Sequence, residues 1–129
     1  MRERVIVALD HPDIEAALAC ARSLQGHARW VKVGMTLFYR EGPAAVRAMR
    51  ELGFDVFVDL KLNDIPHQVE GAAAALGSLG AGMLSVHASG GADMMEAAVR
   101  GAASGADGAS VPRPAVIAIT KRGGGPIGS

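Results

Sequence analysis

Short apolar runs alternate with stretches of helical periodicity along the chain. The apolar runs are rich in β-branched residues, and they predict strands at 5–9, 30–34, 54–60, 83–87 and 115–120. Apolar positions recur every three to four residues between these runs, which predicts helices at 14–26, 43–53, 65–79 and, approximately, 92–101. Repeats of roughly 25 to 30 residues, each with one strand and one helix, are typical of βαβ units. The sequence therefore indicates an α/β protein with a parallel sheet.

Two architectures are compatible with this alternation of strands and helices. One is an open, doubly wound sheet. The other is a (β/α)8 barrel of the TIM-barrel type, which needs roughly 250 residues. The 129 residues provide only about four and a half βα units, so the barrel alternative corresponds to about half of a barrel. Periodicity alone does not decide between the two.

Charged residues lie in or directly after the predicted strands, where apolar residues are the norm. Asp10 follows the first strand, Lys32 lies in the second, and Asp59, Lys61 and Asp64 lie in or after the third. The two-residue period of a strand places Asp59 and Lys61 on the same face. A structural ion-pair cluster or an exposed strand end would explain these charges. A functional site is the other interpretation, because α/β enzymes place their chemistry at the carboxyl ends of parallel strands.

An alternating array of lysines and aspartates has a definite chemical use. Each ammonium is kept charged by the neighbouring carboxylates, and each carboxylate by the ammoniums. Such an array can stabilise a developing carbanion and deliver a proton to it. The four histidines have no metal-ligand spacing, and the chain has no phosphate-binding glycine motif of the Walker or dinucleotide type. We therefore expect neither a metal nor a cofactor.

Composition narrows the class of protein further. Thirteen basic and thirteen acidic residues give a formal net charge of zero, which argues against nucleic-acid binding and against a polybasic membrane surface. No apolar run approaches the roughly 18 residues of a membrane span, and no signal peptide is recognisable. Cys20 is the single cysteine, so no internal disulfide is expected. These features predict a cytoplasmic protein.

Several motifs together resemble one enzyme family. They are Ala8-Leu9-Asp10, Lys32-Val33-Gly34, the block Asp59-x-Lys61-x-x-Asp64-Ile65-Pro66, and Val86-His87-Ala88. In order and spacing they are similar to the orotidine 5′-phosphate decarboxylase family, over residues 4 to about 120. The D-x-K-x-x-D-I-P block is the most specific of these signals.

The resemblance implies a (β/α)8 barrel that works as a homodimer. The family is a carbon–carbon lyase that converts orotidine 5′-phosphate to UMP and CO2 in de novo pyrimidine biosynthesis, without metal or cofactor. By resemblance, Lys61 donates the proton to C6 of the pyrimidine, and Asp59 lies beside the substrate carboxylate. Lys32 bridges the array and the ribose, Asp64 reaches into the partner's site, and Asp10 binds a ribose hydroxyl.

The sequence also departs from the family pattern. Gln68 stands where many relatives have a threonine, so we expect a changed substrate contact at this position. Residues 121–129 are glycine-rich, do not resemble the family's continuation, and are predicted to be a flexible tail. Residues 1–120 are then the N-terminal part of a barrel, without the later loop that grips the substrate phosphate. We expect a truncated chain with impaired activity.

An incomplete barrel would leave part of its interior surface open. Four inward-facing apolar residues are expected to face water, namely Ile6, Ala8, Ile117 and Ile119. Such a surface favours self-association. We therefore expect the isolated chain to be either oligomeric, with two half-barrels closing on each other, or only partly folded. Two alternative functions remain open: a magnesium-dependent sugar-phosphate enzyme of the same superfamily, of the hexulose-phosphate synthase type, and a non-catalytic half-barrel. The first of these has a glutamate on the second strand where this chain has Lys32.

Overall fold

The computed structural model describes residues 5–120. Its elements follow the predicted alternation. In chain order they are β1 (Ile6–Leu9), α1 (Ile14–Leu24), β2 (Trp30–Gly34), α2 (Met35–Glu41), α3 (Pro43–Glu51), β3 (Asp55–Leu62), α4 (Pro66–Ser78), β4 (Met83–His87), the 3-10 turn η2 (Ala88–Gly90), α5 (Ala92–Ala109) and β5 (Ala115–Ile119). The predicted glycine-rich tail lies outside the described residues.

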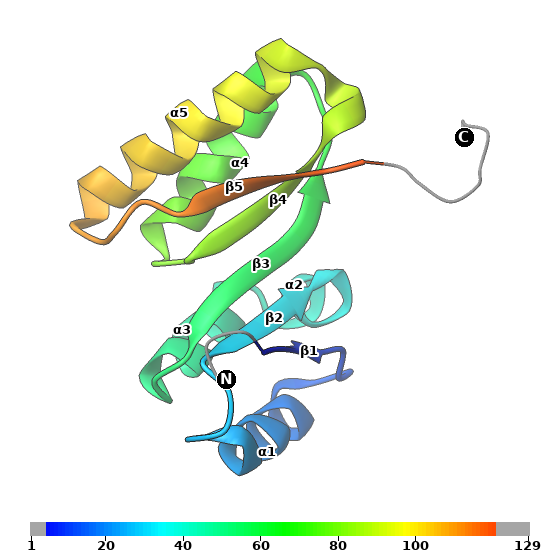
Figure 1. Ribbon diagram of the computed structural model, residues 1–129, viewed down its shortest axis with the longest axis vertical. Helices are drawn as coiled ribbons and strands as arrows, with labels where there is room; N and C mark the ends of the chain where they lie inside the picture. Colours follow the sequence, from blue (N-terminus) through cyan, green and yellow to red (C-terminus); the bar gives the residue numbers. More distant parts are fainter. Residues whose placement is uncertain (1–4, 121–129) are drawn as a thin grey trace.

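All five strands form one parallel sheet in the order β1-β2-β3-β4-β5 (Figure 1). Each strand pairs with the next strand along the chain. A doubly wound sheet would instead reverse its order at a switch point. The order is therefore that of a barrel wall, which settles the choice that periodicity left open.

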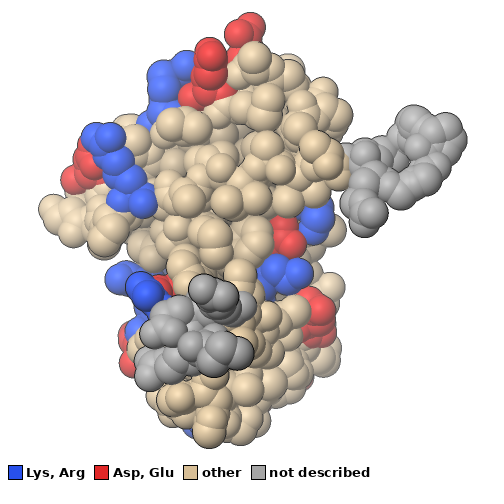
Figure 2. Space-filling view, in the orientation of Figure 1, with Lys and Arg blue, Asp and Glu red and all other residues tan. Residues whose placement is uncertain are grey.

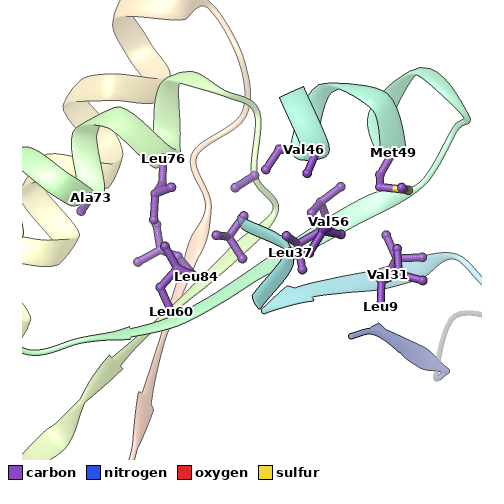
Figure 3. Packing of buried hydrophobic residues seen from close by; sticks show 14 of the residues in the cluster. Leu9, Val31, Leu37, Val46, Met49, Val56, Leu60, Ala73, Leu76 and Leu84 are labelled. Carbon is purple, nitrogen blue, oxygen red and sulfur yellow. The ribbon is translucent and has the colours of Figure 1, made fainter. Parts of the chain in front are cut away.

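One face of the sheet is covered by helices and forms the core. The two-residue period of a strand brings alternate apolar residues to this face. On the three central strands these residues are fully or almost fully buried: Val31, Val33, Val56, Val58, Leu60, Leu84 and Val86. Figure 3 shows the helices above them, with Val46 and Met49 of α3 on the side of Val56, and Leu76 of α4 directed at Leu60 and Leu84. The apolar pattern of the strands thus places the helices on a single face.

The opposite face of the sheet is open. Ile6 and Ala8 on β1 are exposed, Ile6 by 45%, as the sequence predicted. Ile117 and Ile119 on β5 are half-buried rather than exposed. They pair in register with Ser85 and His87 of β4, and a neighbouring strand shields part of each side chain. The prediction of open apolar residues was therefore right for β1 and too strong for β5.

Helix α5 continues to Ala109, eight residues beyond its predicted end near Gly101. A Cβ on Gly101 or Gly105 would overlap the backbone of α4, at Glu70 and Ala74 respectively. These glycines therefore allow α4 and α5 to pack closely, and they do not end the helix. No helix within residues 5–120 has both the length and the apolar character needed to cross a membrane.

Helix α2 was not predicted. It occupies seven residues between two glycines, and Gly42 ends it with a φ of 69°. Its Leu37 is fully buried in the core. Seven residues are about two turns, which is too short for a clear helical period in the sequence. This helix directly follows β2 and so lies at the same end of the sheet as the predicted charges.

Candidate active site

The carboxylate of Asp59 is the centre of a charged cluster on the open face. Its Oδ2 atom lies 3.0 Å from Nζ of Lys61 and 3.6 Å from Nζ of Lys32. Its Oδ1 atom accepts a hydrogen bond of 2.6 Å from the hydroxyl of Ser85 on β4. The structure thus brings three of the predicted site residues together and adds a fourth side chain. Figure 2 shows acidic and basic groups next to one another at the right-hand side of the molecule, about halfway up.

The three charged side chains of this cluster differ in how deeply they are buried. The Asp59 side chain is only 9% exposed, whereas the Lys32 and Lys61 side chains are 34% and 40% exposed. A buried carboxylate is costly unless it is paired and hydrogen-bonded, and Asp59 has partners on both oxygens. The two ammonium groups reach from this buried carboxylate towards solvent. They are the groups that a bound molecule on this face would meet.

The pKa of Asp59 reflects these opposing influences. Burial alone would raise the pKa of its carboxyl group. The hydrogen bond from Ser85, the hydrogen bond and charge of Lys61 and the charge of Lys32 lower it, and together they outweigh burial. The pKa of Asp59 therefore lies below its ordinary value. Asp59 is ionised at neutral pH and keeps negative charge beside both lysines.

An irregularity in β3 positions Lys61. The register between β3 and β4 pairs Val58 with Leu84 and Leu62 with Val86, so β3 has extra residues between these pairs. Lys61 lies within this bulge with a φ of 52°, in the left-handed region that non-glycine residues rarely occupy. Such a conformation costs about 1–3 kcal/mol unless the surroundings hold it. The bulge changes the direction of the backbone at Lys61, and with it the direction of the lysine side chain.

Asp10 and Asp64 lie at the same end of the sheet but outside the cluster. A Cβ placed on Gly34 would lie 3.6 Å from Oδ1 of Asp10, which puts this exposed carboxylate beside the end of β2. The exposed Asp64 carboxylate accepts a hydrogen bond of 2.7 Å from the backbone N–H of Ile65. Among the described residues, no ion pair joins Asp10 or Asp64 to Lys32 or Lys61.

A cleft of about 500 Å³ adjoins the cluster. Predicted site residues Lys61, Asp64 and Gln68 line it, together with Tyr39 from α2 and Asn63. Tyr39 is 70% exposed, and the sequence did not single it out because α2 was not recognised. Asp59, Lys32 and Asp10 do not line this cleft. The predicted residues therefore divide between the open sheet face and the adjoining cleft.

Ser85 is the polar side chain that the sequence interpretation missed. It lies in the centre of β4 and is fully buried. A serine inside an otherwise apolar strand was the available signal, because a buried hydroxyl needs a hydrogen-bond partner. Within residues 5–120, no group of three or more histidine, cysteine or acidic side chains is placed to hold a metal ion.

Comparison with known proteins identifies what this arrangement resembles. The sequence model of the orotidine 5′-phosphate decarboxylase / HUMPS family matches residues 3–123. The chain is 52% identical over 118 residues to the orotidine 5′-phosphate decarboxylase of Cutibacterium acnes, which covers 92% of this chain and 48% of the relative. The chain thus spans about half the length of the curated relatives it matches.

Solved structures match in fold as well as in sequence. An uncharacterised conserved protein from Geobacillus kaustophilus superimposes with a TM-score of 0.83 and 45% identity, over 91% of this chain and 54% of that one. Orotidine 5′-phosphate decarboxylase from Lactobacillus acidophilus gives a TM-score of 0.82 and 36% identity, over 95% and 54% respectively. The fold is therefore about half of a (β/α)8 barrel, as predicted.

Proposed function

Because the chain belongs to the orotidine 5′-phosphate decarboxylase / HUMPS family, we propose that it supplies the charged part of a site that converts orotidine 5′-phosphate to UMP and CO2. The observation that carries the proposal is the Lys32–Asp59–Lys61 cluster, which joins the middle of β2 to the carboxyl half of β3. The curated relatives with 44–54% identity bear the name of this decarboxylase. The reaction is that of a carbon–carbon lyase in pyrimidine biosynthesis, a cytoplasmic pathway.

The cluster suits the chemistry of this reaction. When the bond between C6 and the carboxylate breaks, CO2 leaves and the electron pair stays on C6 of the pyrimidine. In our proposal the Nζ of Lys61 gives a proton to that carbon and later regains one from water. Asp59 orients Lys61, because the two groups lie 3.0 Å apart. The ammonium groups stabilise the developing negative charge, so the proposed reaction requires no metal and no cofactor.

The remaining predicted residues would hold the substrate. Lys32 would contact the ribose and the array, and Asp10 would bind a ribose hydroxyl. Asp64 and Gln68 lie with Lys61 in the adjoining cleft, where we propose that they contact substrate across a homodimer interface. The chain spans about half of its relatives, and we propose that the phosphate grip lies in the other half of the barrel. Without that half, turnover would be very low and the open face would favour self-association.

A fused protein tests the proposal directly. Residues 1–120 would be joined to the second half of the Cutibacterium acnes relative, and turnover of orotidine 5′-phosphate would be followed by its absorbance. Lys61→Ala should lower turnover by at least roughly 10²–10⁴-fold, because it removes the acid and a stabilising charge. Arg100→Ala is the matched control, since it removes an exposed cation that pairs with Glu70 on α4.

Two outcomes would contradict this assignment. One is parental turnover by the Lys61→Ala fusion. The other is turnover of a hexulose phosphate with Mg²⁺ in place of orotidine 5′-phosphate, which would favour the sugar-phosphate branch of the family. If the folded fusion turns over neither substrate, the chain is a non-catalytic half-barrel.

The homodimer proposal has its own test. The fusion carrying Asp64→Ala and the fusion carrying Lys61→Ala would be mixed under conditions that exchange subunits. If Asp64 acts across the interface, one of the two sites in a mixed dimer is intact, and part of the activity returns. Demonstrated exchange without recovery of activity would assign Asp64 to its own subunit's site.

A further inference from the structure

One buried hydroxyl contacts both residues at the centre of the cluster. Ser85 donates a hydrogen bond to Oδ1 of Asp59 at 2.6 Å. The hydroxyl oxygen of Ser85 also accepts a hydrogen bond from the backbone N–H of Lys61 at 2.9 Å. A hydroxyl has one proton and two lone pairs, so it can make both bonds at the same time. Ser85 is thus the direct link between β4 and the irregular part of β3.

The backbone of β3 needs a partner at this position. The bulge takes Lys61 out of regular register with β4, and its left-handed φ of 52° is held only if the surroundings favour it. The Lys61 N–H finds its acceptor in the Ser85 side chain instead of a strand carbonyl. Removing that hydroxyl would leave the N–H without this partner, which is costly for a shielded donor.

The carboxylate of Asp59 needs the same partner for its orientation. Its Oδ2 atom faces both lysines, from β2 and from within β3. Its Oδ1 atom is fixed by Ser85 from β4. Partial rotation of the carboxylate about its terminal bond would move Oδ2 away from both ammonium groups and Oδ1 away from Ser85. The hydrogen bond from Ser85 opposes that rotation.

We propose that Ser85 is a positioning residue, whose hydroxyl stabilises the bulge of β3 and orients the Asp59 carboxylate towards Lys32 and Lys61. The proposal concerns geometry, and only its consequence for turnover rests on the proposed function. The hydrogen bond also stabilises the ionised form of Asp59, in keeping with the lowered pKa of that carboxyl group.

The test uses the 129-residue chain and needs no activity. NMR would follow the titration of the Asp59 carboxyl carbon and the hydrogen exchange of the Lys61 amide in the parent, in Ser85→Ala and in Ser85→Thr. Ser85→Ala should raise the pKa of Asp59 and speed exchange at Lys61 by about tenfold, the effect of one lost hydrogen bond. Amides of Val31 and Val58 in the adjacent ladder should keep their exchange rates. Ser85→Thr retains the hydroxyl and should restore both properties.

Ser78→Ala is the matched control, because Ser78 donates only to the Ala75 carbonyl on the exposed side of α4. It should change neither property. Parental behaviour of Ser85→Ala at both Asp59 and Lys61 would overturn the proposal. So would equal acceleration at Val31 and Val58, since that would mean general loosening of the sheet. If threonine is too large for the site, cysteine provides a smaller hydrogen-bonding replacement.

Turnover provides an independent measurement in the fused protein described above. Misplacement of Asp59 and Lys61 should lower kcat by roughly 10- to 100-fold in Ser85→Ala, with KM little changed. A rise in KM at unchanged kcat would overturn the positioning role. If the parent fusion is inactive, the proposed function fails, while the NMR measurements still decide whether Ser85 positions the cluster.

Discussion

The two faces of the sheet are built from the same strands but bury different kinds of side chain. On the helix-covered face, residues such as Val33, Val58 and Leu84 are completely buried and apolar. On the open face, Asp59 and Ser85 are the buried polar side chains within residues 5–120. Each has its hydrogen-bonding groups paired with the other or with Lys61. The covered face therefore fixes the fold, and the open face accommodates charged groups because they are paired and partly solvated.

Apolar and charged side chains are mixed along the open face. Phe57 of β3 and Met83 of β4 lie level with Lys32 of β2, and Asp59 and Lys61 follow Phe57 towards the carboxyl end of β3. In barrel enzymes the carboxyl ends of the strands serve function and the amino ends serve stability. Substitutions on the two faces should consequently differ in kind and in size.

The largest contrast should come from truncating one apolar side chain on each face. Leu84→Ala removes a fully buried side chain and should lower the free energy of unfolding by about 2–5 kcal/mol. Ile6→Ala removes a side chain that is 45% exposed, and the loss should be below about 1 kcal/mol. Urea unfolding followed by circular dichroism measures both. Equal losses would mean that the open face is buried in solution by another surface.

A smaller effect should arise within the helix layer, where glycines permit close packing. Gly105→Ala places a methyl group against the Ala74 backbone, and we expect a loss of about 1–3 kcal/mol as α4 and α5 move apart. Gly108 on the same helix has nothing within 4 Å of the added Cβ. Gly108→Ala should instead stabilise the protein, by up to about 1 kcal/mol. The same urea measurement applies to both variants. Destabilisation by both substitutions would mean that the loss arises from the carboxyl end of α5 and not from its contact with α4.

On the open face, pH should reveal the contribution of Asp59. Its folded pKa is depressed, because Ser85, Lys61 and Lys32 together outweigh the effect of burial. The stabilisation is therefore fully present above the unfolded pKa of about 3.9 and is lost as pH falls through the lower folded value. Unfolding free energies at a series of pH values should converge for the parent and Asp59→Asn at the acidic end. A constant difference down to low pH would contradict the depressed pKa.

The smallest effect is expected at an exposed ion pair between the end of α5 and the segment before β5. Asp107 at the end of α5 accepts two hydrogen bonds from Arg113, of 3.0 and 2.7 Å. These bonds lower the pKa of Asp107, but both groups are exposed and the attraction is screened by water and salt. Asp107→Asn should leave the midpoint of urea unfolding unchanged within error. A clear shift would show that the bidentate geometry matters more than its exposure.

Much of this comparison follows from sequence pattern. Apolar runs located all five strands, and the two-residue period correctly placed Asp59 with Lys61 on one face and Val58 with Leu60 on the other. The proximity of Lys32 to Asp59 follows from parallel pairing of adjacent strands. These features are local or depend only on neighbours in the chain.

Other features depend on contacts that a periodic pattern does not contain. The bulge at Lys61 requires the side chain of Ser85, 24 residues further along. The length of α5 depends on α4, because Gly101 and Gly105 act as contact points and not as stops. Gly77 inside α4 is a contact point of the same kind, because it packs against the backbone of Ala102 on α5. Helix α2 was too short to be seen, and Tyr39 was missed with it.

The sequential strand order has a consequence for how the molecule folds. Each pairing joins residues 24 to 32 positions apart, from Ile6 with Trp30 to Met83 with Ala115. The entropy of loop closure rises only slowly with length, so these pairings differ little in the cost of closing their loops. Each strand after the first pairs with the strand before it, so the sheet can be extended one strand at a time from β1 to β5. The charged cluster takes its side chains from β2, β3 and β4 alone, so its assembly does not depend on β5.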